Sequence, residues 1–227
     1  MMKFRSGASK IRPIAVLIVA AVVALGALYA YDSLAPKTVP VLLQSPDVIV
    51  VSPGLSVNYS TLELNPASTG GPATLVVSAP PGLTVGLSTS TVSASQPGPI
   101  SVTLNASAGI SPGNYTFSVQ EQQSGGKQIQ RFGVDVVPAL VIILHERYNP
   151  NDLNVTKGTE VTWINLDSQI GCCDPGYHTV TFTSGANASS PILKRLDYWS
   201  YTFDDDGSYD YHCTIHLFML GRVNVSS

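Results

Sequence analysis

Alternating hydrophobic and polar positions divide most of the chain into short segments that we expect to be β-strands. Between residues 44 and 138, Pro-Gly, Gly-Gly and Ser-rich turns separate the segments. Alternation with a period of two gives a strand one apolar face, and seven such strands predict a β-sandwich. The predicted strands are 48–51, 55–62, 73–78, 83–87, 100–105, 114–120 and 128–137.

The same pattern continues beyond Pro138, which we take as a domain boundary. The segment 139–227 has about 90 residues, enough to bury a core of its own. Its alternating segments predict a second, Greek-key sandwich. These strands are expected at 140–145, 153–155, 160–165, 178–183, 198–203, 207–213 and 221–225, with a helical turn or loop at 191–197.

The N-terminus follows a different pattern. Residues 14–31 are uninterrupted apolar or small side chains, and the preceding segment 1–13 carries four basic residues. An apolar run of this length predicts a transmembrane anchor, and the basic flank predicts a cytoplasmic tail. A cleaved signal peptide is the alternative. The Pro-containing segment 32–43 is then an extended linker. The predicted fold class is all-β: two β-sandwich domains, at 44–138 and 139–227, behind a single-pass N-terminal transmembrane helix in the cell membrane, with both domains extracytoplasmic.

Charge and chemistry are distributed unevenly. The first 13 residues hold four of the 12 Lys and Arg and none of the 15 Asp and Glu. The rest of the chain therefore has 8 basic and 15 acidic residues, a net charge of −7. This excess argues against nucleic acid as a partner. Residues 44–138 contain no His, Cys, Met or Trp, so the first domain is either a spacer or a partner-binding module. All four His and all three Cys lie at or after position 145, and Met219 is the sole Met beyond the first two residues.

One stretch places three metal-binding side chains close together. Alternation from Ser208 puts Cys213 on the same face as two tyrosines, and His216 and Met219 follow at intervals of three residues. A second imidazole is expected from His178, whose predicted strand carries apolar residues at alternate positions. Two His, one Cys thiolate and a weak axial Met are the ligands of blue copper sites. The sequence therefore predicts one mononuclear type 1 copper, held by His178, Cys213, His216 and Met219.

The motif Cys-x-x-His-x-x-Met after Tyr-x-Tyr-x-Cys resembles the ligand loop of the cupredoxins, with a spacing similar to that of the amicyanins and shorter than in plastocyanin. The segments 160–165 and 177–182 resemble the family's V-x-W-x-N strand and first copper histidine. The resemblance covers about residues 139–227. It implies that Asn165 ties the first ligand strand to the ligand loop and that the backbone at Thr179 donates to the Cys213 sulfur. In the first domain, residues 112–119 resemble the late-strand signature of immunoglobulin-like domains, in which a tyrosine pins a corner.

The resemblance implies electron transfer and not enzymatic catalysis. Leu217 and Phe218 flank His216, and we expect them to form an apolar patch where redox protein partners dock. A copper carrier or storage surface protein, and an accessory subunit of a membrane oxidoreductase, are the alternatives. Multicopper oxidases carry paired His-x-His segments, and this chain has none.

The remaining chemistry-bearing residues receive less specific interpretations. Cys172 and Cys173 are adjacent, which leaves three states open: a strained vicinal disulfide, ligands of a second metal or of a remodelled first site, or free thiols. His145 and His212 are predicted to be solvated or structural side chains. The acidic run 204–206 is predicted to be a turn between two strands.

Overall fold

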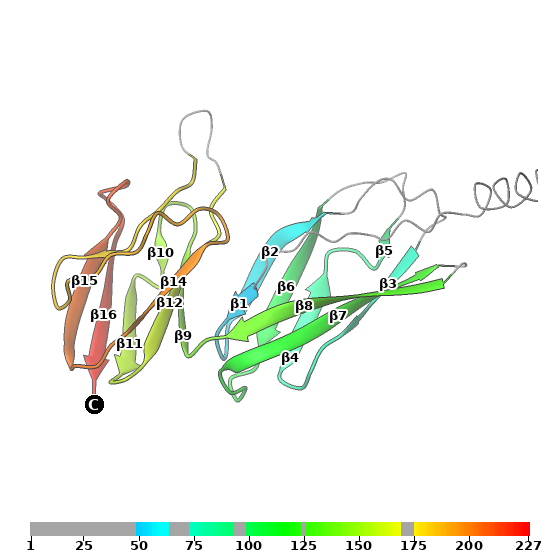
Figure 1. The fold of residues 1–227 in the computed structure, drawn as a ribbon, viewed down its shortest axis with the longest axis horizontal. Helices are drawn as coiled ribbons and strands as arrows, with labels where there is room; N and C mark the ends of the chain where they lie inside the picture. The colour runs from blue at the N-terminus through cyan, green and yellow to red at the C-terminus, as the bar shows by residue number, and fades with distance from the viewer. Residues whose placement is uncertain (1–48, 64–72, 93–98, 124–125, 169–174) are drawn as a thin grey trace, which may run out of the picture.

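The computed structural model describes residues 49–63, 73–92, 99–123, 126–168 and 175–227. All regular secondary structure in these segments is β-strand (Figure 1). The all-β prediction is therefore confirmed for the part of the chain that the structure describes. No helix long and apolar enough to cross a membrane occurs in these segments. The predicted anchor at 14–31 and the linker at 32–43 lie outside them.

The segment 49–136, here called the N-terminal region, contains two sheets (Figure 1). Both contribute side chains to one apolar core, in which Tyr59, Leu104 and Phe117 are almost completely buried. The five-stranded sheet has the order β1 (Ile49–Val51), β8 (Gly126–Val136), β7 (Gly113–Gln123), β3 (Ala73–Ser78) and β5 (Thr91–Val92). The three-stranded sheet has the order β2 (Ser56–Glu63), β6 (Pro99–Ala106) and β4 (Leu83–Leu87).

The segment 139–227, the C-terminal region, also contains two sheets around one core. Aromatic side chains dominate this core, with Trp163 in contact with Phe182, Phe203 and Tyr211. One sheet has the order β10 (Tyr148–Asn149), β9 (Ala139–Ile143), β12 (Glu160–Asn165) and β14 (Tyr198–Thr202). The other has the order β11 (Asp152–Thr156), β16 (Leu220–Ser226), β15 (Gly207–His212) and β13 (Thr181–Phe182).

Strand β12 is buried on both faces. Val161 and Trp163 belong to the core of the C-terminal region, whereas Ile164, from the opposite face, belongs to the apolar cluster that also contains the core of the N-terminal region. Leu140 of β9 joins the same cluster. Thr162 is buried as well, and its hydroxyl is hydrogen-bonded to Ser200 at 2.8 Å. Two buried residues on the outer face of this sheet, Leu140 and Ile164, thus belong to the same apolar cluster as the core of the N-terminal region.

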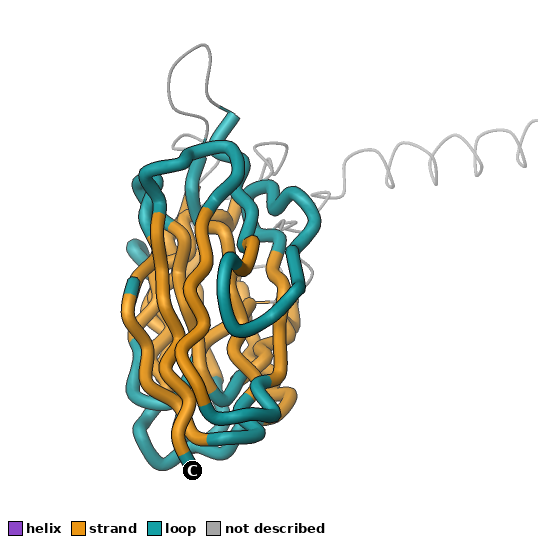
Figure 2. Tube along the Cα trace, turned by 90° about the vertical axis from the view of Figure 1, so that its left-hand side faces the viewer, coloured by secondary structure: helices purple, strands orange, loops and turns teal. Residues whose placement is uncertain are grey.

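Strands β15 and β16 form an antiparallel hairpin that presents its connecting loop at the end opposite the C-terminus (Figures 1 and 2). Figure 2 shows the strands running along the molecule, with loops gathered at both ends. Residues 213–219 form the connecting loop. The fold therefore brings the predicted ligand loop to one end of the C-terminal region.

The predicted strands overlap the observed ones, and β3, β4 and β12 have the predicted bounds. The predicted strand 178–183 is wrong in length, because only Thr181 and Phe182 pair with β15. His178 instead forms an isolated bridge with Leu193. The Ser190 N–H donates to the Val180 carbonyl, and the Val180 N–H donates to Ser190 Oγ. The segment before Thr181 therefore pairs with the irregular loop 188–193. That loop contains no helix.

Candidate metal centre

Cys213 arrives at the site at the end of β15, as the alternation predicts. Tyr209, Tyr211 and Cys213 are all buried and belong to the same core. The loop that follows is closed by two backbone bonds: Cys213 N–H donates to the Met219 carbonyl at 3.2 Å, and Met219 N–H donates to the His216 carbonyl at 2.9 Å. These bonds hold residues 213–219 in a compact turn above the sheet.

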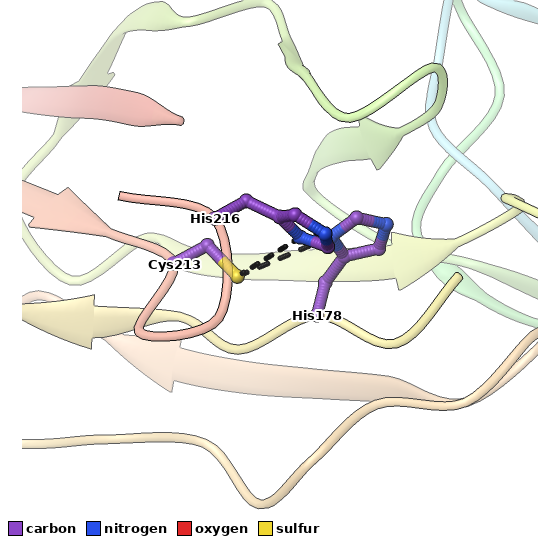
Figure 3. A group of neighbouring side chains, drawn as sticks. All are labelled: His178, Cys213 and His216. Carbon is purple, nitrogen blue, oxygen red and sulfur yellow. Dashed lines mark hydrogen bonds between the residues drawn. The ribbon is translucent and has the colours of Figure 1, made fainter. Parts of the chain in front are cut away.

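His178 reaches the same point from another part of the chain. Its backbone exchanges two hydrogen bonds with Leu193, of 3.1 and 2.8 Å, and its side chain is fully buried. Figure 3 shows His178, Cys213 and His216 converging, with His178 on the segment before β13 and the other two on the loop after β15. One loop and one separate segment thus supply the three side chains.

The ligand atoms of these three residues have the separations that a trigonal metal site requires. The two Nδ1 atoms are 3.2 Å apart, and Cys213 Sγ lies 4.0 Å from His178 Nδ1 and 3.8 Å from His216 Nδ1. Bonds of about 2.0 Å to nitrogen and about 2.3 Å to sulfur, the lengths known for zinc, place trigonal ligands roughly 3.5 to 3.7 Å apart. The structure therefore fits a metal bound by two imidazoles and a thiolate. Among the described residues, this is the one group of three or more His, Cys, Asp or Glu side chains with such spacing.

Electrostatics favour the thiolate that a metal needs. Burial raises the pKa of Cys213, but hydrogen bonds from His178 and from the backbone N–H groups of Thr179, His216 and Ile215 outweigh it and lower the pKa to about 6. Burial lowers the pKa of His178, but the facing Cys213 and Asp167 outweigh it and raise the pKa above its usual value. Each group thus stabilises the charged form of the other.

Thr179 connects the two ligand segments. Its backbone N–H lies 3.4 Å from Cys213 Sγ, and its hydroxyl accepts the Thr214 N–H at 2.9 Å. The predicted tie through Asn165 is different in the structure: its amide donates to the carbonyls of Gly176 and Leu193, on the His178 side. Asn165 therefore braces the first-ligand segment, because its short side chain ends there, and Thr179 makes the link to the ligand loop.

The other residues of the loop divide into buried and exposed. Met219 is 2% exposed, while Leu217 and Phe218 are 72% and 67% exposed beside a partly exposed His216. The Phe218 ring centroid lies 6.0 Å from that of His216. A groove of about 940 Å³ adjoins this loop, lined by residues 144–149, Asn151 and residues 218–220.

Sequence reasoning missed Asp167. The structure places its carboxylate 2.9 Å from His178 Nε2, on the side of the ring away from Cys213. A single acidic residue two positions after Asn165 gives no periodic signal, since its partner lies beyond an intervening loop. A buried carboxylate close to a histidine could be found only once the fold is known.

Several other predicted residues do not join the cluster. His145 is exposed in the turn after β9, and His212 is the last residue of β15, next to Cys213 but outside the cluster. The acidic residues 204–206 are exposed between β14 and β15, as the predicted turn requires. Cys172 and Cys173 lie outside the described residues, so their three states stay open.

Known proteins share the C-terminal region. The sequence profile of copper binding proteins of the plastocyanin/azurin family matches residues 145–226. Amicyanin of Paracoccus denitrificans is 38% identical over 90 residues, which are 38% of this chain and 63% of that protein. Amicyanin of Paracoccus versutus is 30% identical over 96 residues, 39% of this chain and 67% of that protein.

Two solved structures are also similar in sequence to this chain. A reduced amicyanin mutant is 37% identical, with coverage of 39% of this chain and 81% of that one and a TM-score of 0.34. A purple cupredoxin from Nitrosopumilus maritimus is 29% identical, with coverage of 39% and 99% and a TM-score of 0.34.

The sheets, the converging ligand atoms and the sequence matches define a cupredoxin. Through its C-terminal region the chain belongs to the plastocyanin/azurin family of copper-binding proteins. The match spans 63% of the length of the Paracoccus denitrificans amicyanin. The cluster of His178, Cys213 and His216, with Met219 buried in the same loop, fits a type 1 copper site.

Proposed function

We propose that the chain is a membrane-anchored, extracytoplasmic electron-transfer protein with one type 1 copper. The observation that carries the proposal is the convergence of His178 Nδ1, His216 Nδ1 and Cys213 Sγ within 4.8 Å of one another. Copper bound there supplies a one-electron couple between Cu(I) and Cu(II). The thiolate and the Met219 thioether suit the reduced ion, and the imidazoles suit the oxidised ion, so one ligand set serves both.

The chain's own contacts support fast electron transfer, because they hold the ligands in place whatever the oxidation state. Backbone bonds fix the loop that carries Cys213 and His216, and a bridge to Leu193 fixes His178. Thr179 joins the two segments through Thr214. A site held in this way needs little rearrangement when an electron arrives or leaves.

The apolar surface around His216 supports a docking role. Leu217 and Phe218 are more than half exposed, as is Leu220. Exposed apolar groups clustered beside a partly exposed ligand favour contact with a protein partner rather than solvent. Electrons then enter and leave through His216, and the partner is another redox protein.

The remaining parts of the chain receive supporting roles in this proposal. The apolar run 14–31 anchors the protein in the membrane, with the tail 1–13 in the cytoplasm. The N-terminal region is an immunoglobulin-like spacer, an interpretation supported by Tyr115, whose hydroxyl donates to the Ser111 carbonyl four residues upstream. No residue of this region is a metal ligand in the proposal.

The main rival is a copper carrier or storage protein, and the two are separated by what happens on reduction. We expect the full chain to keep one copper through repeated reduction and reoxidation in the presence of a moderate Cu(I) chelator, because all the proposed ligands stay in place. A carrier would hand copper to the chelator once reduced. Loss of the metal at the first reduction step would therefore contradict the proposal. The other alternative, an accessory subunit, has a different test: such a subunit would co-purify with a membrane oxidoreductase.

A further inference from the structure

Asp167 is a buried carboxylate beside the proposed copper site. It is 2% exposed and lies in the loop after β12. Its Oδ2 atom is 2.9 Å from His178 Nε2, and among the described residues His178 is its ion-pair partner. Burial of a charge costs free energy unless the charge is paired and hydrogen-bonded, so the contacts of this carboxylate must offset the cost of its burial.

The hydrogen bonds around Asp167 fix its position from three sides. Oδ1 accepts the backbone N–H of His145 at 2.6 Å, and Oδ2 accepts that of Glu146 at 2.8 Å. The Asp167 N–H donates to Asn165 Oδ1 at 2.9 Å. The carboxylate is therefore a fixed acceptor, and it faces His178 before any metal binds.

A fixed acceptor at Nε2 decides which ring nitrogen of His178 carries the proton. In the neutral imidazole that a metal requires, the Nε2–H donates to Asp167 and the lone pair of Nδ1 is directed toward Cys213 and His216. Ligating histidines are commonly held by a carboxylate in this way, which orients the ring and makes it a stronger electron donor. The negative charge also attracts a doubly charged ion more strongly than a singly charged one.

We propose that Asp167 is a positioning residue that orients His178 toward copper and stabilises the oxidised over the reduced form. This inference rests on the proposed copper site. A purely structural role is the competing explanation, because Asp167 also anchors His145 and Glu146, both of which have a positive φ of 54°.

The test compares full-length chains loaded with copper. Asp167→Asn keeps an acceptor for His178 but removes the charge, and Asp204→Asn removes an equal charge from the exposed turn before β15. We expect Asp167→Asn to keep the intense visible band and to shift the equilibrium about tenfold toward the reduced form, a rise of about 59 mV for one electron. Asp204→Asn should leave the potential unchanged.

A second measurement needs no variant. In the reduced wild-type chain, the Nε2–H proton of His178 should exchange slowly and resonate far downfield in proton NMR, because a buried carboxylate accepts it. If Asp167→Asn leaves the reduction potential unchanged and lowers only the unfolding midpoint of the metal-free chain, Asp167 serves to anchor the loop and the inference is overturned. A rapidly exchanging Nε2–H proton of His178 in the wild-type chain would also overturn it. A chain that gives no intense band with Cu(II) would overturn the proposed function itself, and this inference with it.

Discussion

Met219 is the side chain through which a single substitution acts most directly on the proposed redox couple. It is buried at 2% exposure, and its backbone closes the loop that begins at Cys213. The loop therefore keeps its shape when the end of this side chain is altered. A change in the potential of such a variant reports on the ligand and not on the fold.

We predict that Met219→Gln lowers the reduction potential while copper stays bound, because a harder oxygen ligand favours Cu(II) over Cu(I). Met219→Leu is the matched control, since it keeps the apolar volume and supplies no oxygen, and it should not lower the potential. Voltammetry of the full chain measures both. Equal potentials in wild type and Met219→Gln would mean that Met219 is core packing and not a ligand.

The residues of the site differ in how far sequence could reveal them. Cys213, His216 and Met219 are close in sequence, so spacing alone brings them together, and His178 follows from its apolar neighbours and the family motif. Asp167 could not be found, because its contact with His178 depends on the path of the loop between them. The role expected of Asn165 fails for a similar reason: only the fold shows that its amide faces Gly176 and Leu193.

At the scale of elements, the hairpin of β15 and β16 carries the ligand loop. Gly221 of β16 lies opposite Tyr211 of β15, and a Cβ atom at Gly221 would overlap the Tyr211 ring. That ring packs edge-on against Trp163 and Tyr148 in the core. The absence of a side chain at Gly221 thus allows a large aromatic residue to support the strand just before Cys213.

Gly221→Ala is therefore expected to destabilise the metal-free chain by about 1 to 3 kcal/mol, the usual cost of overpacking a close contact. Gly109→Ala is the control, because a Cβ there meets no atom within 4 Å. Its effect should stay within about 0.5 kcal/mol. Urea unfolding measures both, and equal stability of the two variants would show that the hairpin tolerates a shift of Tyr211.

The same hairpin carries an ion pair whose effect depends on pH. Arg222 Nε donates to Asp210 Oδ1 at 2.6 Å. This hydrogen bond lowers the pKa of Asp210 below its ordinary value of 3.8. Burial raises the pKa by a smaller amount, and a hydrogen bond from Ser184 lowers it further. A lowered pKa in the folded state stabilises the fold above the ordinary pKa, and this contribution is lost as the pH falls through the folded-state value.

Arg222→Gln should accordingly lower the unfolding free energy of the metal-free chain at pH 7 by a small amount, since both side chains are partly exposed. The difference from wild type should shrink below about pH 4. Lys157→Gln removes an equal charge from a more exposed pair and serves as the control. A difference that stays constant from pH 7 to pH 2 would exclude Asp210 as its source.

Alternation along the sequence predicted most of the strands, but it fixed the bounds of only some of them. The strands at 73–78, 83–87 and 160–165 have the predicted bounds, whereas the regularly alternating segment 114–120 belongs to a longer strand, Gly113–Gln123. Strands β5 and β10 have two residues each, too few for any period to show. The segment at His178 alternates in sequence, but its partner is the loop 188–193, and His178, Thr179 and Val180 are all buried.

At the scale of the whole molecule, the two regions share apolar contacts. Leu140 and Ile164 of the C-terminal region are 2% and 0% exposed within the cluster that contains the core of the N-terminal region. Separation of the regions would expose both side chains to water. Burial of each contributes about 1.5 to 3 kcal/mol, so the contact favours joint unfolding.

We predict that the metal-free chain unfolds in one transition. Both tryptophans, Trp163 and Trp199, lie in the C-terminal region, so fluorescence reports on that region while far-UV circular dichroism reports on all strands. The two probes should give the same urea midpoint, as expected for a two-state process. Separate midpoints would mean that the shared cluster does not couple the regions, and that the N-terminal region is an independently folding spacer.

The central claim, a type 1 copper held by Cys213, is tested most directly by the visible and EPR spectra of the full chain with one equivalent of Cu(II). A thiolate in the plane of the two imidazoles should give an intense visible charge-transfer band and an EPR signal with a small copper hyperfine splitting. Cys213→Ser should lose both, whereas Cys172→Ser/Cys173→Ser should keep them. A band that persists in Cys213→Ser, or disappears in Cys172→Ser/Cys173→Ser, would contradict the account.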